Sequence, residues 1–227
     1  MKLSKLSLAL CLFGATALAV GGAASASTIL INGSFEDGVP DNKLGLDNHA
    51  LFGNLNTSGP SYDRWKKLIG WRTVAGPGIE VQTNRTLPQI DAQDGTHYVE
   101  LDSTKNSAMA QTVSLKAGSY LLSFWYSPRT ADTKTNGIEY RIGNLFGGKV
   151  NNGDFGAEPG RWVEVTSRFV VKKGADYELR FDAVGKSDGK GGLLDSVDVA
   201  PVPLPAAGLG LLAALAGLAG LRLRRRA

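Results

Sequence analysis

Cysteine is almost absent from this chain of 227 residues, since it occurs once, at Cys11. Because that residue lies in the apolar N-terminal run described below, the rest of the chain has no thiol. Disulfides, thiolate zinc sites and cysteine nucleophiles are therefore excluded from it. Histidine is scarce too, with only His49 and His97, which argues against a histidine-rich site for a transition metal.

Long hydrophobic runs are confined to the two ends of the chain. At the N-terminus, Lys2 and Lys5 precede an apolar run over residues 6–20, and the sequence Ala-Ser-Ala follows at residues 24–26. A short basic region, an apolar run of this length and an A-x-A sequence are typical of a secretory signal peptide. We therefore predict a signal peptide over residues 1–26.

The excess of positive charge is also confined to the ends. The formal net charge is +4, but two of the 25 basic residues are Lys2 and Lys5, and four are arginines among the last six residues. The remaining 19 basic residues are matched against 21 acidic ones, so the middle of the chain is slightly negative. Since binding to nucleic-acid phosphates needs clustered Lys and Arg, we exclude nucleic acid as a partner.

The middle of the chain has no long helical period. Of the 29 glycines in the chain, 22 lie in this part and separate short segments rich in β-branched and aromatic residues. Residues 119–127, 161–171 and 176–183 alternate apolar and polar side chains. These features predict one all-β domain over residues 27–201, a two-sheet β-sandwich such as a jelly roll. The expected strands are residues 28–35, 68–74, 78–83, 97–101, 107–115, 119–127, 138–144, 161–171, 176–183 and 193–199.

Residues 37–67 are the exception. This polar, glycine-rich stretch does not divide into strands, and a loop of that length is usually functional or flexible. Within it, residues 62–68 are compatible with a short helix.

The C-terminus, residues 202–227, contains a second recognisable signal. Its elements are a Val-Pro-Leu-Pro-Ala motif, an apolar run up to Leu221 and a cluster of arginines. In this order they resemble the PEP-CTERM class of sorting signals, in the variant with a VPLPA motif. The residues that carry the resemblance are Val202, Pro203, Leu204, Pro205, Ala206, Arg224, Arg225 and Arg226.

That resemblance implies export in a Gram-negative bacterium. The tail would form a transmembrane helix in the inner membrane, with its arginines on the cytoplasmic side, and an exosortase-type processing enzyme would recognise the motif. The protein would then reach the cell surface or an extracellular, biofilm-like matrix. The alternative interpretation of residues 202–227 is an ordinary single-span tail anchor.

Two short motifs at opposite ends of the domain suggest a family for the sandwich. Asn-Gly-Ser-Phe-Glu at residues 32–36 and Gly-Gly-Leu-Leu-Asp-Ser-Val at residues 191–197 together resemble the galactose-binding-like jelly rolls, which include many carbohydrate-binding modules. The resemblance implies a structural Ca²⁺ where the first and last strands meet. Glu36 and Asp195 match the carboxylate positions, and Asp94 is a third candidate; alternatively, these carboxylates only accept hydrogen bonds from turn amides.

Polysaccharide binding requires an exposed aromatic face beside planar polar groups. Trp125 is the best-placed aromatic residue because small polar residues share its face of the strand, and further candidates would line the same face if their strands adjoin. The alternative for each aromatic residue is burial in the sandwich, which is what we expect of Trp71 and Trp162. The candidate ligand-binding residues are Trp125, Arg129, Glu139, Arg141 and, in the long loop, Trp65.

An enzyme and a structural protein are the competing classes. Glu80, Glu100 and Asp102 supply carboxylates for a glycosidase-type pair, but a chain with 21 acidic residues produces such pairs by chance. Residues 185–189, Gly-Lys-Ser-Asp-Gly, have the G-x-S-x-G spacing, but they lie between two expected strands with no helical pattern after them, so no nucleophile elbow is predicted. We interpret His97 as a hydrogen-bonded structural residue. We therefore predict a non-catalytic, exported protein that binds polysaccharide, with a surface protein that binds other proteins or itself as the alternative.

Overall fold

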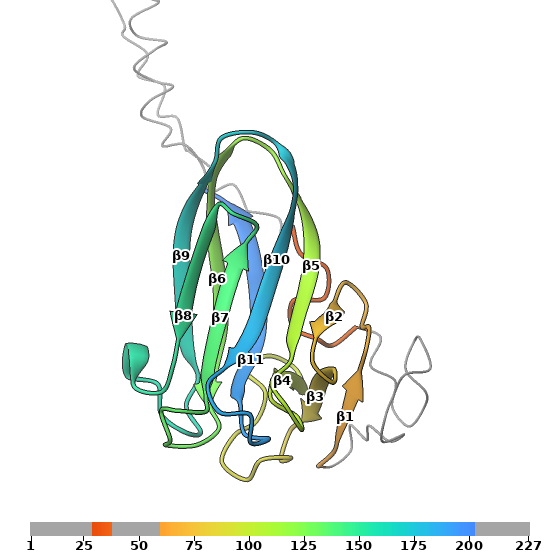
Figure 1. Ribbon diagram of the computed structural model, residues 1–227, viewed down its shortest axis with the longest axis vertical. Helices are drawn as coiled ribbons and strands as arrows, with labels where there is room; N and C mark the ends of the chain where they lie inside the picture. Colours follow the sequence, from red (N-terminus) through yellow and green to blue (C-terminus); the bar gives the residue numbers. More distant parts are fainter. Residues whose placement is uncertain (1–28, 38–59, 203–227) are drawn as a thin grey trace, which may run out of the picture. The chain divides into compact units, whose positions relative to one another are not determined.

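The computed structural model describes residues 29–37 and 60–202, and these form a β-sandwich of two antiparallel sheets (Figure 1). The six-stranded sheet has the order β1-β3-β4-β11-β6-β9, and the five-stranded sheet has the order β2-β5-β10-β7-β8. The strands are β1 Tyr62–Trp65, β2 Arg72–Ala75, β3 Ile79–Thr83, β4 His97–Glu100, β5 Ala108–Leu115, β6 Gly118–Pro128, β7 Gly137–Ile142, β8 Phe146–Val150, β9 Val163–Val171, β10 Ala175–Val184 and β11 Gly192–Pro201. Within the described residues the one helical element is the 3₁₀ turn η1, Asp154–Gly156.

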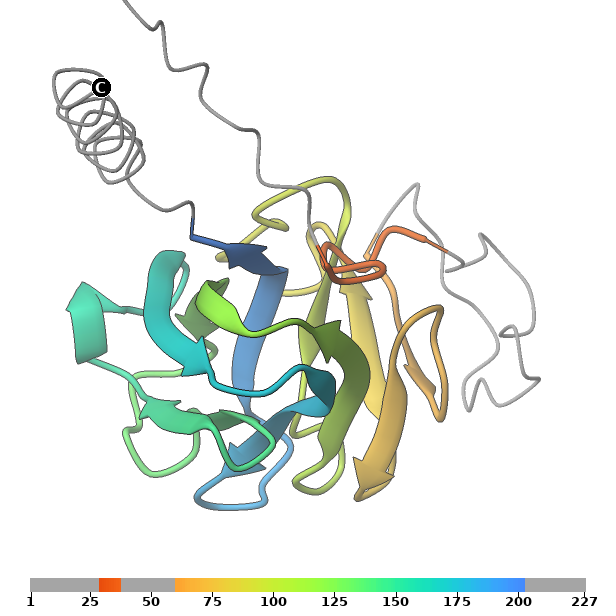
Figure 2. The same cartoon turned by 90° about the horizontal axis from the view of Figure 1, so that it is seen from above.

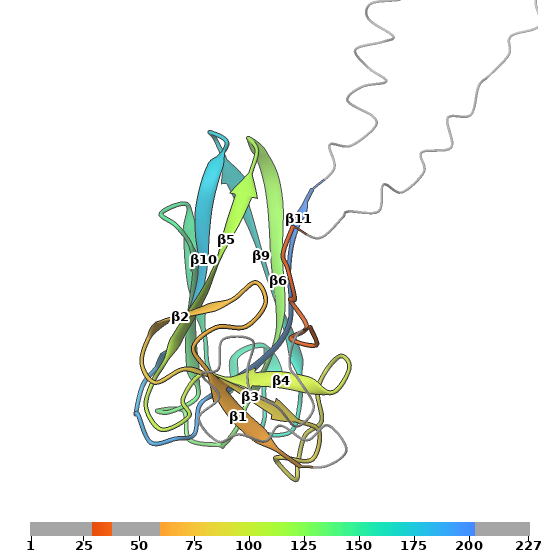
Figure 3. The same ribbon diagram turned by 90° about the vertical axis from the view of Figure 1, so that its right-hand side faces the viewer.

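Period-two alternation, as expected, decides which side chains enter the core. In β6 the side chains of Tyr120, Leu122, Phe124 and Tyr126 are buried, while the intervening ones are more exposed. Phe124 lies between the sheets, with its ring centroid 5.2 Å from that of Phe181 in β10. Burying rings of this size against one another supplies much of the free energy that holds two sheets face to face. Figures 2 and 3 show the resulting layers, with β5 and β10 in one and β6 and β11 in the other.

Residues 29–37 lie along β11, but they do not form the strand expected over residues 28–35. The backbone turns at Asn32 and Phe35, whose φ angles of 54° and 61° lie outside the range of regular extended strand. The segment is instead anchored at single points. The Ile29 amide donates to the Val199 carbonyl (3.2 Å), and the Val197 amide donates to the Gly33 carbonyl (2.9 Å).

The long polar stretch ends in a strand and not in the expected helix. β1 pairs with β3 in antiparallel register, so that Trp65 lies opposite Ile79. Trp65 is only 1% exposed, because it belongs to the main core together with Trp71. Burial of Trp65 therefore favours the strand over a solvent-exposed helix.

A loop covers part of the outer face of the six-stranded sheet. Leu87 and Ile90 of this loop, residues 84–96, form a second apolar cluster with Tyr98 and Leu193. Trp162 packs on the same cluster, with its ring 5.9 Å from that of Tyr98. The expected burial of Trp71 is confirmed, whereas Trp162 is half-buried in this smaller cluster.

The expected signal peptide, most of the long loop and nearly all of the sorting signal lie outside the described residues. In the part of the chain that the structure covers, no helix is long and apolar enough to cross a membrane.

Candidate functional site: a charged hollow on the five-stranded sheet

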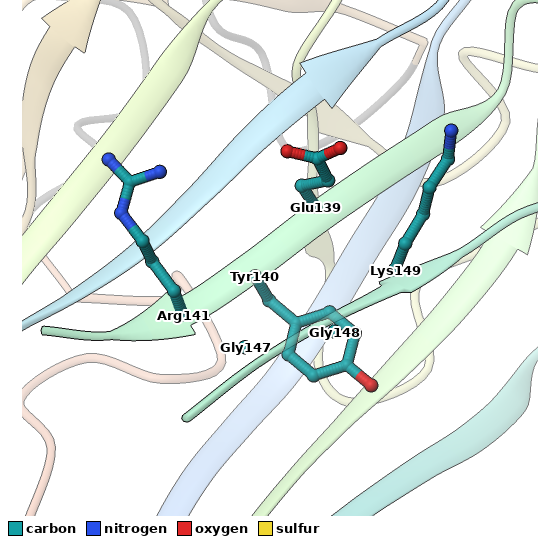
Figure 4. Close-up of a pocket in the computed structure, with 6 residues that line it drawn as sticks. All are labelled: Glu139, Tyr140, Arg141, Gly147, Gly148 and Lys149. Atoms are coloured by element: carbon teal, nitrogen blue, oxygen red, sulfur yellow. The ribbon is translucent and has the colours of Figure 1, made fainter. Parts of the chain in front are cut away.

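The outer face of the five-stranded sheet carries a hollow of about 410 Å³ between β7 and β8 (Figure 4). It is open to solvent at the edge of the sheet. The residues that line it are Glu139, Tyr140, Arg141, Gly147, Gly148 and Lys149. Two of them, Glu139 and Arg141, are candidates from the sequence.

Strand register explains both the walls and the floor of this hollow. The side chains of Glu139 and Arg141 point outward from β7, because the alternate residue Tyr140 points into the core. Across the hairpin, Gly147 lies opposite Arg141 and Lys149 lies opposite Glu139. Since Gly147 has no side chain, nothing on β8 fills the space beside the Arg141 side chain.

Gly148, the second glycine of the hollow, has to be a glycine because the Tyr140 ring packs against it. A Cβ atom at Gly148 would lie 2.5 Å from the Tyr140 hydroxyl oxygen, which is too close for any residue with a side chain. The Tyr140 ring in turn packs on Phe124, with ring centroids 4.9 Å apart. The floor of the hollow is therefore fixed to the aromatic core.

Charged side chains of β10 hold Arg141 in place. Asp182 accepts hydrogen bonds from Arg180 Nε at 2.9 Å and from Arg141 Nη1 at 3.5 Å. The Asp182 carboxylate thus accepts hydrogen bonds from two arginines. Its hydrogen bond with Arg180 raises the pKa of that arginine. The Arg141 side chain remains 44% exposed, so most of its N–H donors face solvent and the hollow.

Lys149 and Glu139 complete the polar lining. Both are exposed, and Lys149 forms no salt bridge with a carboxylate of the described residues. The hollow therefore presents two cationic donors and one anionic acceptor above a backbone floor. Such a set suits a ligand with many hydroxyl groups, since hydroxyls both donate and accept hydrogen bonds.

Trp125 does not share this face, so the expectation of a common face is wrong. Trp125 belongs to β6 of the six-stranded sheet, where its strand partners are Asp195 and Glu164. Its neighbour Phe124 points into the core, so Trp125 points outward on the opposite side of the sandwich from Glu139. The indole is half-buried there.

Two further candidates turn out to be structural. Trp65 is buried in the core and is not accessible to a polysaccharide. Arg129 donates from Nη1 to both carboxylate oxygens of Glu100, at 2.8 and 2.7 Å, and to the Gly189 carbonyl at 2.8 Å. Its guanidinium neutralises a buried carboxylate and is not directed toward the hollow on the other sheet.

The carboxylates considered for catalysis are also buried. Glu80 and Glu100 lie directly opposite each other in β3 and β4, are 5% and 0% exposed, and both accept hydrogen bonds from Gln82 Nε2. Burial raises the pKa of Glu100 to about 8; Arg129 opposes this shift, and the charge of Glu80 adds to it. The hydrogen bonds of Gln82 and Arg129 and the burial of both carboxyl groups leave neither of them exposed to solvent.

Glu36 and Asp195, two of the carboxylates expected to hold a metal, both accept hydrogen bonds from one turn, residues 93–97. Glu36 accepts hydrogen bonds from the amides of Thr96 (2.8 Å) and His97 (2.7 Å), and Asp195 accepts those of Gln93 (2.8 Å) and Asp94 (3.2 Å). These contacts are the ones expected if the carboxylates only accept hydrogen bonds from turn amides, which was the alternative to a Ca²⁺ site. Asp94 thus contributes a backbone amide, and no group of three His, Cys, Asp or Glu side chains within residues 29–37 and 60–202 is arranged to hold a metal ion.

The two carboxyl groups differ in their protonation. Burial raises the pKa of Asp195 to about 7 despite its hydrogen bonds to backbone amides. Partial burial acts in the same direction on Glu36, but hydrogen bonds from His97 and from the Thr96 and His97 amides hold its pKa below the usual value. Glu36 therefore stays ionised where Asp195 titrates near neutrality.

Together, the fold and the hollow define an all-β sandwich protein with an open, charged surface site. No model of a known protein family matches the sequence, and neither does any curated protein. Among solved structures, the chain is similar to the carbohydrate-binding module TmCBM61, solved in complex with β-1,4-galactotriose. The two share 14% identity at a TM-score of 0.46, over 78% of this chain and 100% of the module.

Two more modules show comparable similarity. A family 16 carbohydrate-binding module shares 15% identity at a TM-score of 0.45, over 76% of this chain and 99% of its own. A family 35 module from Clostridium thermocellum shares 19% identity at a TM-score of 0.37, over 50% of this chain and 85% of its own. At these identities the comparison gives no correspondence for individual residues, so the site is defined by its own geometry.

The buried pair Glu80–Glu100 predicts a pH dependence of stability. Since the folded-state pKa of Glu100, about 8, lies above its usual value of 4.5, its stabilising contribution is complete below about pH 4.5 and is lost as the pH rises toward 8. Glu80→Gln removes the neighbouring charge and keeps an acceptor for Gln82. We expect this variant to lose less stability than the parent between pH 5 and 8 in urea unfolding; an equal or steeper loss would contradict the assignment.

Proposed function

We propose that the protein is a non-catalytic module that binds polysaccharide on the outer face of its five-stranded sheet. The observation that carries this proposal is the hollow in which Arg141, Glu139 and Lys149 surround a glycine floor. We further propose that the sandwich is a jelly roll of the galactose-binding-like type, as the motifs at residues 32–36 and 191–197 suggest. Residues 139, 141 and 149 would then contact the sugar.

The chemistry assigns a role to each side chain. Arg141 and Lys149 donate hydrogen bonds to ring and hydroxyl oxygens, and Glu139 accepts hydrogen bonds from hydroxyl groups. Asp182 lies 3.5 Å from Arg141 Nη1 and partly orients the guanidinium, which lowers the conformational entropy that Arg141 loses when a sugar binds. The hollow lies on the edge hairpin β7–β8 and its charged side chains are exposed, so an internal part of a long chain would reach it from solvent.

A non-catalytic role is supported by the position of the acidic residues. On the other sheet, Glu80 and Glu100 are buried and hydrogen-bonded. Glu139 lines the hollow, and the carboxylate opposite it in β10, Asp182, is bound by Arg180 and Arg141. Glycoside hydrolysis usually requires two carboxyl groups on either side of the scissile bond. Binding without turnover is therefore the function that this geometry supports best.

Retention of the purified full-length protein, kept in mild detergent, on a panel of polysaccharide gels tests this function. We expect at least one gel to retard the protein, and Arg141→Ala to weaken that retention about tenfold, since a hydrogen bond to a charged group contributes about 1.5–3 kcal/mol. Arg168→Ala is the matched control, because Arg168 is an exposed arginine of β9 on the other sheet. Equal retention of the two variants, or no retention of the parent, would contradict the proposal.

We also propose that a structural Ca²⁺ binds near residues 93–97, held by Glu36 and Asp195 with Asp94 as a third ligand. Oxygen ligands of this kind suit Ca²⁺, which would offset the burial of the Asp195 carboxylate. Both carboxylates already accept hydrogen bonds from the turn, so the ion would have to replace some of these contacts. The ion would stabilise the fold and take no part in a reaction.

Thermal unfolding with Ca²⁺ or with a chelator tests the metal proposal. We expect Ca²⁺ to raise the melting temperature, because an ion that binds only the folded state stabilises it. Asp94→Asn, which keeps the backbone amide that Asp195 accepts, should lose part of that rise. Identical melting temperatures in Ca²⁺ and chelator would exclude a structural ion.

Finally, we propose that the protein is exported and then sorted by an exosortase-type enzyme, through residues 1–26 and 202–227. It would be held in the inner membrane at least transiently and would end at the cell surface or in the extracellular matrix. The mass of the protein recovered from cells that carry an exosortase tests this. We expect loss of residues 1–26 and of the arginine-rich tail, whereas a mass that retains both ends would contradict it.

A further inference from the structure

Phe155 is an aromatic residue that packing does not explain. It lies in η1, on the loop between β8 and β9, and is 66% exposed. The other large apolar side chains that the structure exposes are less accessible, with Val170 at 59% and Ile31 at 57%. A phenylalanine in this position gains little from burial, so its presence requires another reason.

Its backbone conformation makes the choice of phenylalanine more unusual. Phe155 has φ 54° and ψ 18°, in the left-handed region, between Gly153 at φ 87° and Gly156 at φ 74°. Residues with a Cβ atom are strained in that region, and glycine or asparagine fits it at lower cost. Strain that packing does not offset is a feature of ligand-contacting positions.

The loop around Phe155 is firmly held. Asn151 Nδ2 donates to the Thr133 carbonyl at 2.6 Å, and Asn152 Nδ2 donates to the Ala131 carbonyl at 2.8 Å. Within the loop, the Gly153 amide donates to the Ala157 carbonyl at 3.0 Å, and Ala157 is fully buried. These contacts fix the backbone of the loop, so a ligand that binds there would order few additional backbone torsions.

The loop begins where the hollow ends. Lys149, which lines the hollow, is followed by Val150, the last residue of β8, and then by the loop that carries Phe155. Figure 1 shows η1 beside the ends of β8 and β9, at the end of the sandwich where β8 finishes. η1 packs on β9, the edge strand of the six-stranded sheet, and its loop starts directly after β8, the edge strand of the five-stranded sheet. The exposed ring therefore lies on the same side of the sandwich as the strand that carries Lys149.

We propose that Phe155 is a stacking platform for a pyranose ring of the polysaccharide, beside the subsite in the hollow. This inference rests on the proposed function, and it supplies the apolar contact that the hollow lacks. The C–H face of a pyranose packs on an aromatic ring, while neighbouring sugar hydroxyls reach the charged side chains. The ligand class is therefore a polymer of at least two sugar units, one on the ring and one in the hollow.

The test uses variants that separate recognition from stability. Phe155→Asn removes the ring and relieves the left-handed strain, and we expect it to weaken retention on the polysaccharide gel at least fivefold while the melting temperature stays equal or rises by about 2 °C. Phe155→Tyr keeps a ring and should keep most of the retention. Val170→Ala removes an exposed apolar side chain from β9 and should leave retention unchanged.

The outcomes distinguish this inference from the function it rests on. If the parent protein is retained and Phe155→Asn is retained equally, the stacking platform is overturned while the binding function stands. If no gel retains the parent, both fail. If Phe155→Asn instead dissociates an oligomer seen by analytical ultracentrifugation without changing retention, Phe155 is a contact between copies of the chain and the inference is overturned.

Discussion

Buried and partly buried carboxylates that accept hydrogen bonds from backbone amides hold the loops of this sandwich in place. Asp195 and Glu36 fix the turn at residues 93–97, and Asp102 accepts the amides of Asp188 and Gly189 in the loop before β11. Glu100 accepts hydrogen bonds from the Gly191 amide and from the Arg129 guanidinium. A buried carboxylate is tolerated only when such donors satisfy it. In a chain whose single cysteine is Cys11, these contacts connect distant segments as disulfides do elsewhere.

The same contacts make the two outer faces unequal. On the six-stranded sheet, the loop of residues 84–96 and its apolar cluster cover the ends of β4 and β11, and Glu80 and Glu100 are enclosed near them. On the five-stranded sheet, the β7–β8 hairpin carries glycines where side chains would otherwise stand, and the charged residues beside them remain exposed. The five-stranded sheet therefore exposes the hydrogen-bonding groups of Glu139, Arg141 and Lys149 around a glycine floor, and the loop with Phe155 follows β8.

Much of the fold was predictable from the sequence, because burial between two sheets imposes a period of two that is plainly visible in β6, β9 and β10. The turns within residues 29–37 were not predicted, because a hydrophobic pattern does not indicate which residues, such as Asn32 and Phe35, adopt left-handed φ angles. For the site, Glu139 and Arg141 were named as candidates, and the structure places both on the outer face of β7. Alternation did not place Trp125 relative to them, because the order of strands in a sheet depends on long-range pairing. Lys149 and Phe155 were missed, although the Gly-Gly before Lys149 and the glycines around Phe155 were available signals.

The central claim is that polysaccharide binds on the five-stranded sheet around β7 and β8. Amide hydrogen exchange of the full protein, measured with and without a polysaccharide that retains it, locates the contact directly. The account predicts slower exchange in β7, β8 and the loop at residues 151–157, with β6 and residues 84–96 unchanged. Slower exchange confined to the other sheet, around Trp125 and residues 84–96, would contradict it.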